Sequence, residues 1–225
     1  MRVIATNTLC AFWQTHADAE GPLKAWFAET SRSAWHSMAD IKRQYATASI
    51  IDNERVVFNV GGNKYRLVVK LWFPGKAVCF KFIGTHKRYD PIDVKKLREG
   101  KQAMEIHPIR NQRDHARALR AVEHLWGARP GTAEADKLEI LVTLVDAYEA
   151  KHHPLDPPDP IDAIRFRMEQ MGLTRQHLVS IIGSRARVSE ILNRRRPLTI
   201  AMIARLRDKL GISADVLIGS HRRAA

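Results

Sequence analysis

Cysteine is scarce in this chain, and long apolar runs are missing. Its 225 residues include only two cysteines, Cys10 and Cys79, too few for a disulfide framework or a four-thiolate zinc site. The apolar stretch Leu138–Val145 is interrupted by Glu139 and Thr143 and is far shorter than the ~20 residues of a membrane span. The first ten residues lack the apolar core of a signal peptide. We therefore expect neither secretion nor membrane insertion, and we predict a cytoplasmic protein.

Acidic residues are also in short supply. Lys and Arg together number 37 against 24 Asp and Glu, so the formal net charge is +13. Residues 1–103 and 161–225 each carry +8, whereas residues 104–160 carry −3. This balance favours a nucleic-acid partner. The acidic segment either lies on a basic surface of the same chain or forms a solvated helical linker.

Prolines are concentrated near residue 157. Four prolines fall within seven residues, and they predict a stiff, extended linker over 154–160. The length allows for two domains. We therefore predict a first domain over 1–103, a helical segment over 104–153, the linker, and a last domain over 161–225.

The spacing of apolar residues changes partway along the first domain. Helical spacing up to residue 45 gives way to alternation over residues 56–60, 64–73 and 77–85, with turns at Gly61-Gly62-Asn63 and Pro74-Gly75. This pattern predicts an α+β domain with helices first and an antiparallel meander after them. The odd positions of 65–73 should face the core, as should Val78, Phe80 and Phe82 on the next strand.

The opposite sheet face should be cationic. It would carry five polar or basic side chains: Asn59, Lys64, Arg66, Lys70 and Lys81. No Asp or Glu occurs from Arg55 to Tyr89, whereas a solvated face ordinarily mixes both signs. Such a surface suits phosphates, although a merely solvated face remains the alternative. His86, Tyr89 and Asp90 follow the last strand and could transfer protons, but a lone histidine there is more often structural.

Two motifs in this domain resemble a known family. The segment FNVGGN at 58–63 with Arg66, and THKRYD at 85–90, resemble the HigB-type toxins, which are RelE-like endoribonucleases that cleave mRNA on the ribosome. The resemblance covers essentially all of 1–103. It implies the RelE-like fold, with helices packed on one face of a small antiparallel sheet.

Cleavage of RNA by its own 2′-hydroxyl needs a base, a proton donor and cations for the phosphate, and it needs no metal. Arg66 and Lys81 are the candidates for phosphate stabilisation, with Lys64 assisting. His86 and Tyr89 are candidates for proton transfer or base stacking, and Asp90 for orienting one of them. Further RNA-binding candidates are Asn59, Asn63, Lys64, Lys70, Lys87 and Arg88.

The middle segment predicts two helices, separated by Pro130-Gly131-Thr132. Their apolar stripes are too small to form a core alone, so both should pack on something larger. His152-His153 favours a helix end over a metal site, because no further ligand has suitable spacing. No metal or cofactor is predicted.

The last domain predicts five short helices. Asp159 and Pro160 begin the first, and Ser184 caps the third. The segment SRARVSEILN at 184–193, followed by three arginines, resembles the recognition helix of phage-repressor-type helix-turn-helix domains. Candidate DNA contacts are Thr174, Ser184, Arg185, Arg187, Glu190, Asn193, Arg194 and Arg195. The alternative is a helical bundle that uses its basic face for protein contacts.

Residues 104–225 as a whole resemble a HigA-type antitoxin, whose N-terminal helices hold the toxin and whose last domain binds the operon's promoter. Together, the two resemblances imply that the chain is an mRNA-cleaving toxin joined to its neutralising repressor. The expected partners are mRNA on the ribosome, promoter DNA, an intramolecular or domain-swapped toxin–antitoxin contact, and a second copy through the antitoxin unit. The alternative is a transcriptional regulator whose toxin-like domain is inactive and acts as a sensor.

Overall fold

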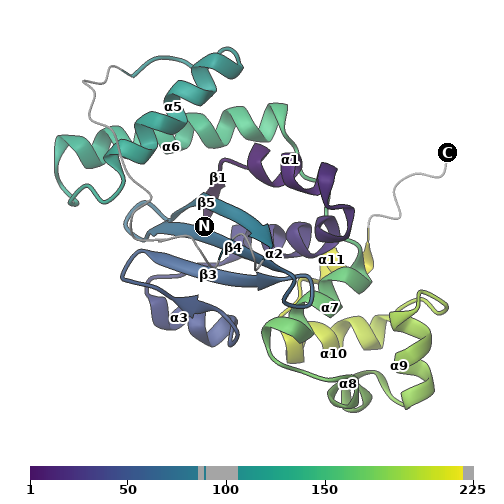
Figure 1. The fold of residues 1–225 in the computed structure, drawn as a ribbon. Coiled ribbons are helices and arrows are strands. Elements are labelled where there is room, and N and C mark those ends of the chain that lie inside the picture. Colours follow the sequence, from purple (N-terminus) through teal and green to yellow (C-terminus); the bar gives the residue numbers. More distant parts are fainter. Residues whose placement is uncertain (86–88, 90–105, 220–225) are drawn as a thin grey trace.

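A five-stranded sheet lies at the centre of the first half of the chain (Figure 1). The computed structural model describes residues 1–85, 89 and 106–219. The strand order is β1-β5-β4-β3-β2, with the bounds β1 (Arg2–Ile4), β2 (Ser49–Ile50), β3 (Arg55–Val60), β4 (Tyr65–Trp72) and β5 (Ala77–Thr85). The predicted antiparallel meander is confirmed as β3-β4-β5. In addition, β1 pairs in parallel with β5, and β2 extends the opposite edge.

The turn between β3 and β4 uses an unusual backbone. Gly61, Gly62 and Asn63 have φ angles of +66°, +67° and +70°, all in the left-handed region. Glycine adopts this region without penalty and asparagine tolerates it, so the sequence fits the turn.

Within residues 1–85, four helical elements pack on one face of the sheet: α1 (Asn7–Thr15), the short 3₁₀ helix η1 (Ala17–Ala19), α2 (Glu20–Arg32) and α3 (Met38–Gln44). The Trp26 ring lies 5.4 Å from the rings of both Phe58 and Phe80, between α2 and the strands. Tyr65, Leu67, Val69 and Leu71 of β4 belong to this core, as the alternation predicts. We call this side of the sheet the helical face and the other side the outer face.

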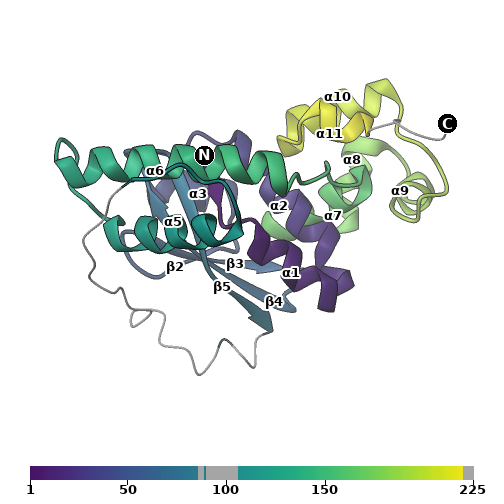
Figure 2. The ribbon, with the colours of Figure 1, turned by 90° about the horizontal axis from the view of Figure 1, so that it is seen from above.

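A helical hairpin covers part of the outer face. Its helices, α5 (Gln112–Leu125) and α6 (Ala133–His152), run side by side across the strands (Figure 2). Val122 and Trp126 share a buried apolar cluster with Trp72 and Cys79 of the sheet. The Trp126 indole also donates a hydrogen bond to the Leu71 carbonyl oxygen at 3.3 Å. The prediction that the helices of the middle segment pack on something larger is therefore confirmed.

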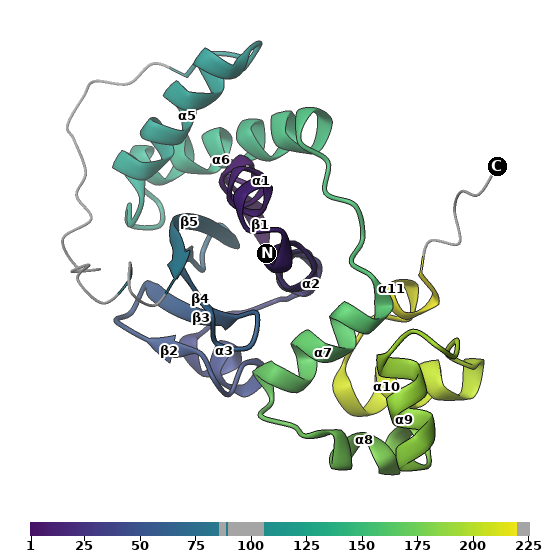
Figure 3. The ribbon, with the colours of Figure 1, turned by 45° about the vertical axis from the view of Figure 1, so that its right-hand side comes forward.

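The C-terminal part, described as far as residue 219, contains five helices: α7 (Pro160–Gln170), α8 (Arg175–Ile182), α9 (Arg185–Leu192), α10 (Ile200–Leu210) and α11 (Ala214–Ile218). Asp159 caps α7, with its carboxylate accepting from the Ile161 and Asp162 amides, and the Ser184 hydroxyl caps α9. Helix α7 also packs against α2, so the apolar core continues from the sheet into this part (Figure 3).

Candidate functional site on the outer face of the sheet

A β-bulge shapes the outer face. Val68 of β4 pairs with Phe82, but the next residue pairs with Phe80, so Lys81 is the extra residue in β5. The bulge turns Phe82 to the outer face, where it packs with Val57 and Val68. The prediction that Phe82 faces the same core as Val78 and Phe80 is therefore wrong, because strict alternation ends at the bulge.

Lys81 lies beneath the helical hairpin. Its ammonium nitrogen is 2.5 Å from the Glu123 carboxylate of α5, and its side chain is only 8% exposed. The cation is thus neutralised by an acid from the segment 104–160, which carries the chain's net negative charge. Sequence reasoning missed Glu123 as the partner, although the charge map pointed to its segment.

The other basic residues of the outer face also have partners. Lys70 is buried, and its ammonium lies 3.2 Å from the Glu54 carboxylate. Arg66 lies opposite Asn59 in the sheet and donates to the Asn63 side-chain oxygen at 2.7 Å. Asn59 donates in turn to the Thr47 carbonyl oxygen at 3.2 Å.

Tyr89 joins the same face. It packs against the cluster of Val57, Val68 and Phe82, with 6.5 Å between its ring centre and that of Phe82. The structure therefore brings Arg66, Lys81 and Tyr89 to one side of the sheet. The candidates His86, Lys87, Arg88 and Asp90 lie outside the described residues.

Lys64 lies elsewhere, and its placement on the cationic face is wrong. It precedes β4, so the strand's alternation does not govern it, and its ammonium pairs at 2.8 Å with Asp18 of η1. The Tyr65 hydroxyl donates to the same carboxylate at 2.6 Å. The hydrogen bond from Lys64 lowers the pKa of Asp18 most. Burial, and then the bond to Asp18, raise the pKa of Tyr65 to about 12.

A buried carboxylate ties the hairpin to the start of α1. Glu149 of α6 accepts from the Ala5 and Thr6 amides at 3.0 and 3.2 Å and from the Thr6 hydroxyl at 3.1 Å. It also lies 2.7 Å from His115 Nε2 of α5. Glu149 and His115 are 3% and 1% exposed, so water does not replace these contacts. No sequence motif predicted this junction.

The second candidate surface is the N-terminal end of α9, which lies away from the sheet (Figure 3). Ser184, Arg185 and Arg187 are exposed there, and Arg185 Nε donates to the Gln176 side chain of α8 at 3.2 Å. Thr174 caps α8 together with His177. Glu190 pairs with Arg196 at 2.7 Å, while Asn193 and Arg195 are exposed.

Arg194 is directed at α7 instead. Its guanidinium lies 2.9 Å from the Asp159 carboxylate and 2.7 Å from that of Asp162, and the hydrogen bond with Asp162 is the main cause that raises its pKa. This residue therefore fixes the loop after α9 against α7.

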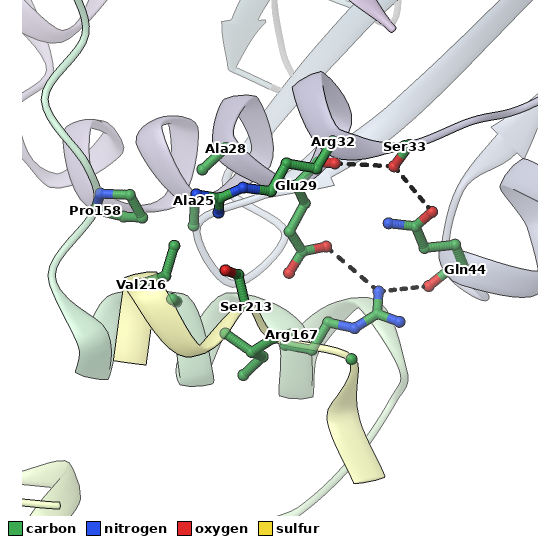
Figure 4. A pocket seen from close by; sticks show the side chains of 13 residues that line it. Ala25, Ala28, Glu29, Arg32, Ser33, Gln44, Pro158, Arg167, Ser213 and Val216 are labelled. Atoms are coloured by element: carbon green, nitrogen blue, oxygen red, sulfur yellow. Dashed lines mark hydrogen bonds and ion pairs between the residues drawn. The ribbon is translucent and has the colours of Figure 1, made fainter. Parts of the chain in front are cut away.

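A cavity of about 360 Å³ lies between α2, α7 and the segment 211–216 (Figure 4). Arg167 donates to the Gln44 carbonyl oxygen at 2.7 Å and lies 3.5 Å from the Glu29 carboxylate. Burial raises the pKa of Glu29 in spite of this cation. These contacts hold the C-terminal helices on the first half of the chain.

Within residues 1–85, 89 and 106–219, no three His, Cys, Asp or Glu side chains are grouped to hold a metal ion. In the same part of the chain, no helix is long and apolar enough to cross a membrane.

Known proteins resemble both halves of this arrangement. Residues 19–92 match the HigB_toxin family, described as the RelE-like toxic component of a toxin–antitoxin system. The chain is also 30% identical over 134 residues to Antitoxin HigA of Escherichia coli strain K12, a match that covers 54% of this chain and 94% of that protein. Antitoxin HigA of Shigella flexneri matches with the same identity and coverage. The chain therefore belongs to the HigA family of toxin–antitoxin systems, and it also carries a segment that matches the toxic HigB component.

Proposed function

We propose that this chain is a toxin and its antitoxin in one polypeptide. Residues 1–103 are the mRNA endoribonuclease, 104–153 neutralise it, and 161–225, after the linker at 154–160, form a helix-turn-helix domain that represses the operon. The protein acts in the cytoplasm, where its substrate is mRNA on the ribosome. The antitoxin unit pairs with a second copy on promoter DNA.

The observation that carries this proposal is the contact between Lys81 and Glu123. Lys81 is a candidate for binding the scissile phosphate, yet its side chain is almost fully covered by α5 and paired with an acid. A polyanionic substrate would have to displace that carboxylate and the helix that carries it. This coverage of Lys81 supports the proposal that the toxin unit is inhibited in the intact chain.

The chemistry proposed for the outer face uses the RNA 2′-hydroxyl as nucleophile and requires no metal. Arg66 and Lys81 would stabilise the negative charge that develops on the phosphate. Tyr89 packs on the same face and would stack on a base or transfer a proton. His86 and Asp90 remain candidates for proton transfer and orientation.

Expression of residues 1–103 alone tests the enzyme. We expect this fragment to arrest growth, and the full chain to be nearly harmless, because a short tether holds the hairpin at a high effective concentration. Arg66→Ala and Lys81→Ala in the fragment should abolish or greatly weaken the arrest, whereas Lys76→Ala, in the turn before β5, should not.

Circular dichroism must show that each fragment is folded. Folded Arg66 and Lys81 variants that arrest growth as fully as the parent would refute the assignment. A folded but harmless parent fragment would favour the alternative, a regulator with an inactive toxin-like domain.

Exposure of the α9 N-terminus supports the proposed DNA-binding role. Arg185 and Arg187 would face base edges in the major groove, with Thr174, Ser184, Asn193 and Arg195 near the backbone and Glu190 near a cytosine. Arg185→Ala in the full chain should cost about 1–3 kcal/mol on a palindromic promoter site and less on random DNA. Arg113→Ala on α5 removes the same charge far from α9 and serves as the control. Absence of binding to any promoter fragment at low salt would refute this role.

A further inference from the structure

The β3–β4 turn presents a cluster of backbone donors. Because Gly61, Gly62 and Asn63 all have positive φ, the amides of this turn do not enter the ladder between the strands. Successive amides in turn conformations of this kind can form a concave anion-binding nest. The amides of Gly62 and Asn63 both point at one anion.

That anion is the carboxylate of Glu169, near the end of α7. One oxygen accepts from the Gly62 amide at 2.9 Å and the other from the Asn63 amide at 3.2 Å. The neighbouring residue secures this position, since the side-chain amide of Gln170 donates to the Asn59 carbonyl oxygen at 2.6 Å. Two oxygens of one acid thus occupy two adjacent donors.

A phosphate fits the same donors. Its two non-bridging oxygens match a carboxylate in spacing and charge, and Arg66 adds a cation beside the turn, bonded to the Asn63 side chain. Burial raises the pKa of Glu169, while the two amides and, to a smaller extent, Arg66 act to lower it. A Cβ atom at Gly62 would meet no atom within 4 Å, so there is room for a larger group at the turn.

The turn adjoins the candidate active face. Asn59, Arg66 and Gly84 form one row across β3, β4 and β5, and Thr85 pairs with Tyr65 at the turn. The same arginine therefore serves the outer face and the turn. An RNA strand on that face would bring a further phosphate within reach of Gly62 and Asn63.

We infer that the β3–β4 turn is a binding site for an RNA backbone phosphate, and that Glu169 occupies it as a phosphate mimic. The RNA part of this inference rests on the proposed function. Two contacts then block RNA binding: α5 covers Lys81, and Glu169 of α7 occupies the β3–β4 turn. Because α7 is also the first helix of the C-terminal part, RNA binding requires that part to shift from its present position.

The test is a nuclear magnetic resonance titration of the full chain that follows the backbone amides of Gly62 and Asn63. The probes are inorganic phosphate and a six-nucleotide 2′-O-methyl RNA, which cannot be cleaved. In the Glu169→Ala variant, both probes should shift these two resonances saturably, with at least tenfold higher affinity than in the parent chain. Glu134→Ala, an exposed acid of α6, controls for the change in net charge and should behave like the parent.

A natively folded Glu169→Ala protein whose turn resonances respond to neither probe would overturn the inference. If that variant does not fold, Glu169→Gln preserves the packing of α7 and is subject to the same criterion. A response to phosphate but not to the oligonucleotide would overturn the assignment to RNA. An unresponsive turn combined with a toxic 1–103 fragment refutes this inference alone, whereas a responsive turn with a harmless folded fragment refutes the enzyme.

Discussion

Replacement of Glu149 by alanine should strongly destabilise the chain. This carboxylate accepts from two backbone amides and one hydroxyl at the start of α1, and it pairs with His115. All four groups belong to residues that are at least nine-tenths buried. Alanine would leave them without an acceptor in a place where water cannot enter.

The magnitude follows from the number of groups left unpaired. A buried amide without a partner costs about 1–3 kcal/mol of stability. Glu149→Ala leaves two such amides, those of Ala5 and Thr6, without an acceptor. We therefore expect the free energy of unfolding to fall by about 2–6 kcal/mol, or roughly 10 °C in melting temperature for a chain of this size. Glu149→Gln keeps one acceptor oxygen and should lose about half as much.

Urea denaturation followed by tryptophan fluorescence and circular dichroism measures this loss. Glu139→Ala, an exposed acid on the same helix, is the control and should change stability by less than about 0.5 kcal/mol. A loss below about 1 kcal/mol in Glu149→Ala would refute the argument that this carboxylate joins α6 to the first half.

Three further predictions concern single residues. Burial beneath the hairpin raises the pKa of Cys79 to about 11, so in a Cys10→Ser background this thiol should react with a disulfide reagent at pH 8 at least ~100-fold more slowly than a free cysteine. Glu123→Lys should accelerate the reaction by loosening α5, and an unchanged rate would count against that contact. The raised pKa of Tyr65 means that its contribution to stability is complete below its usual pKa and is lost as the pH rises through about 12. Asp18→Asn should shift the tyrosine titration at 295 nm to lower pH, and an unchanged titration would contradict the role of that hydrogen bond. Arg194→Ala should cost about 1 kcal/mol of stability and leave the salt dependence of DNA binding unchanged, whereas Arg195→Ala should reduce its slope by about 1. Equal effects of the two variants on that slope would show that Arg194 also contacts DNA.

Local chemistry made most of the helices and strands predictable. The change from helical spacing to alternation located β3, β4 and β5, because each depends on residues a few positions apart. The caps at Asp159 and Ser184 were predictable for the same reason. Arg66 and Lys81 were placed on the outer face from alternation, as the structure has them.

Two side chains were placed on the wrong side of the sheet because the alternation of apolar and polar residues does not reveal the features that position them. A bulge at Lys81 moved Phe82 to the other face, and nothing in the residue types announces one extra residue in a paired strand. Lys64 precedes β4, and its ammonium pairs with Asp18, 46 residues away in sequence, instead of lying on the cationic face.

The sequence by itself therefore determined the elements, their caps and the sign of charge on each segment, since these depend on neighbours along the chain. Only the tertiary structure decided which partner each of these buried or half-buried acids meets. Glu123 on Lys81, Glu149 at the start of α1, and Glu169 in the β3–β4 turn join residues 42 to 144 positions apart. Such contacts follow from how whole helices pack on the sheet, and that packing is set by apolar burial over the entire chain, with no local pattern that selects one acid over another.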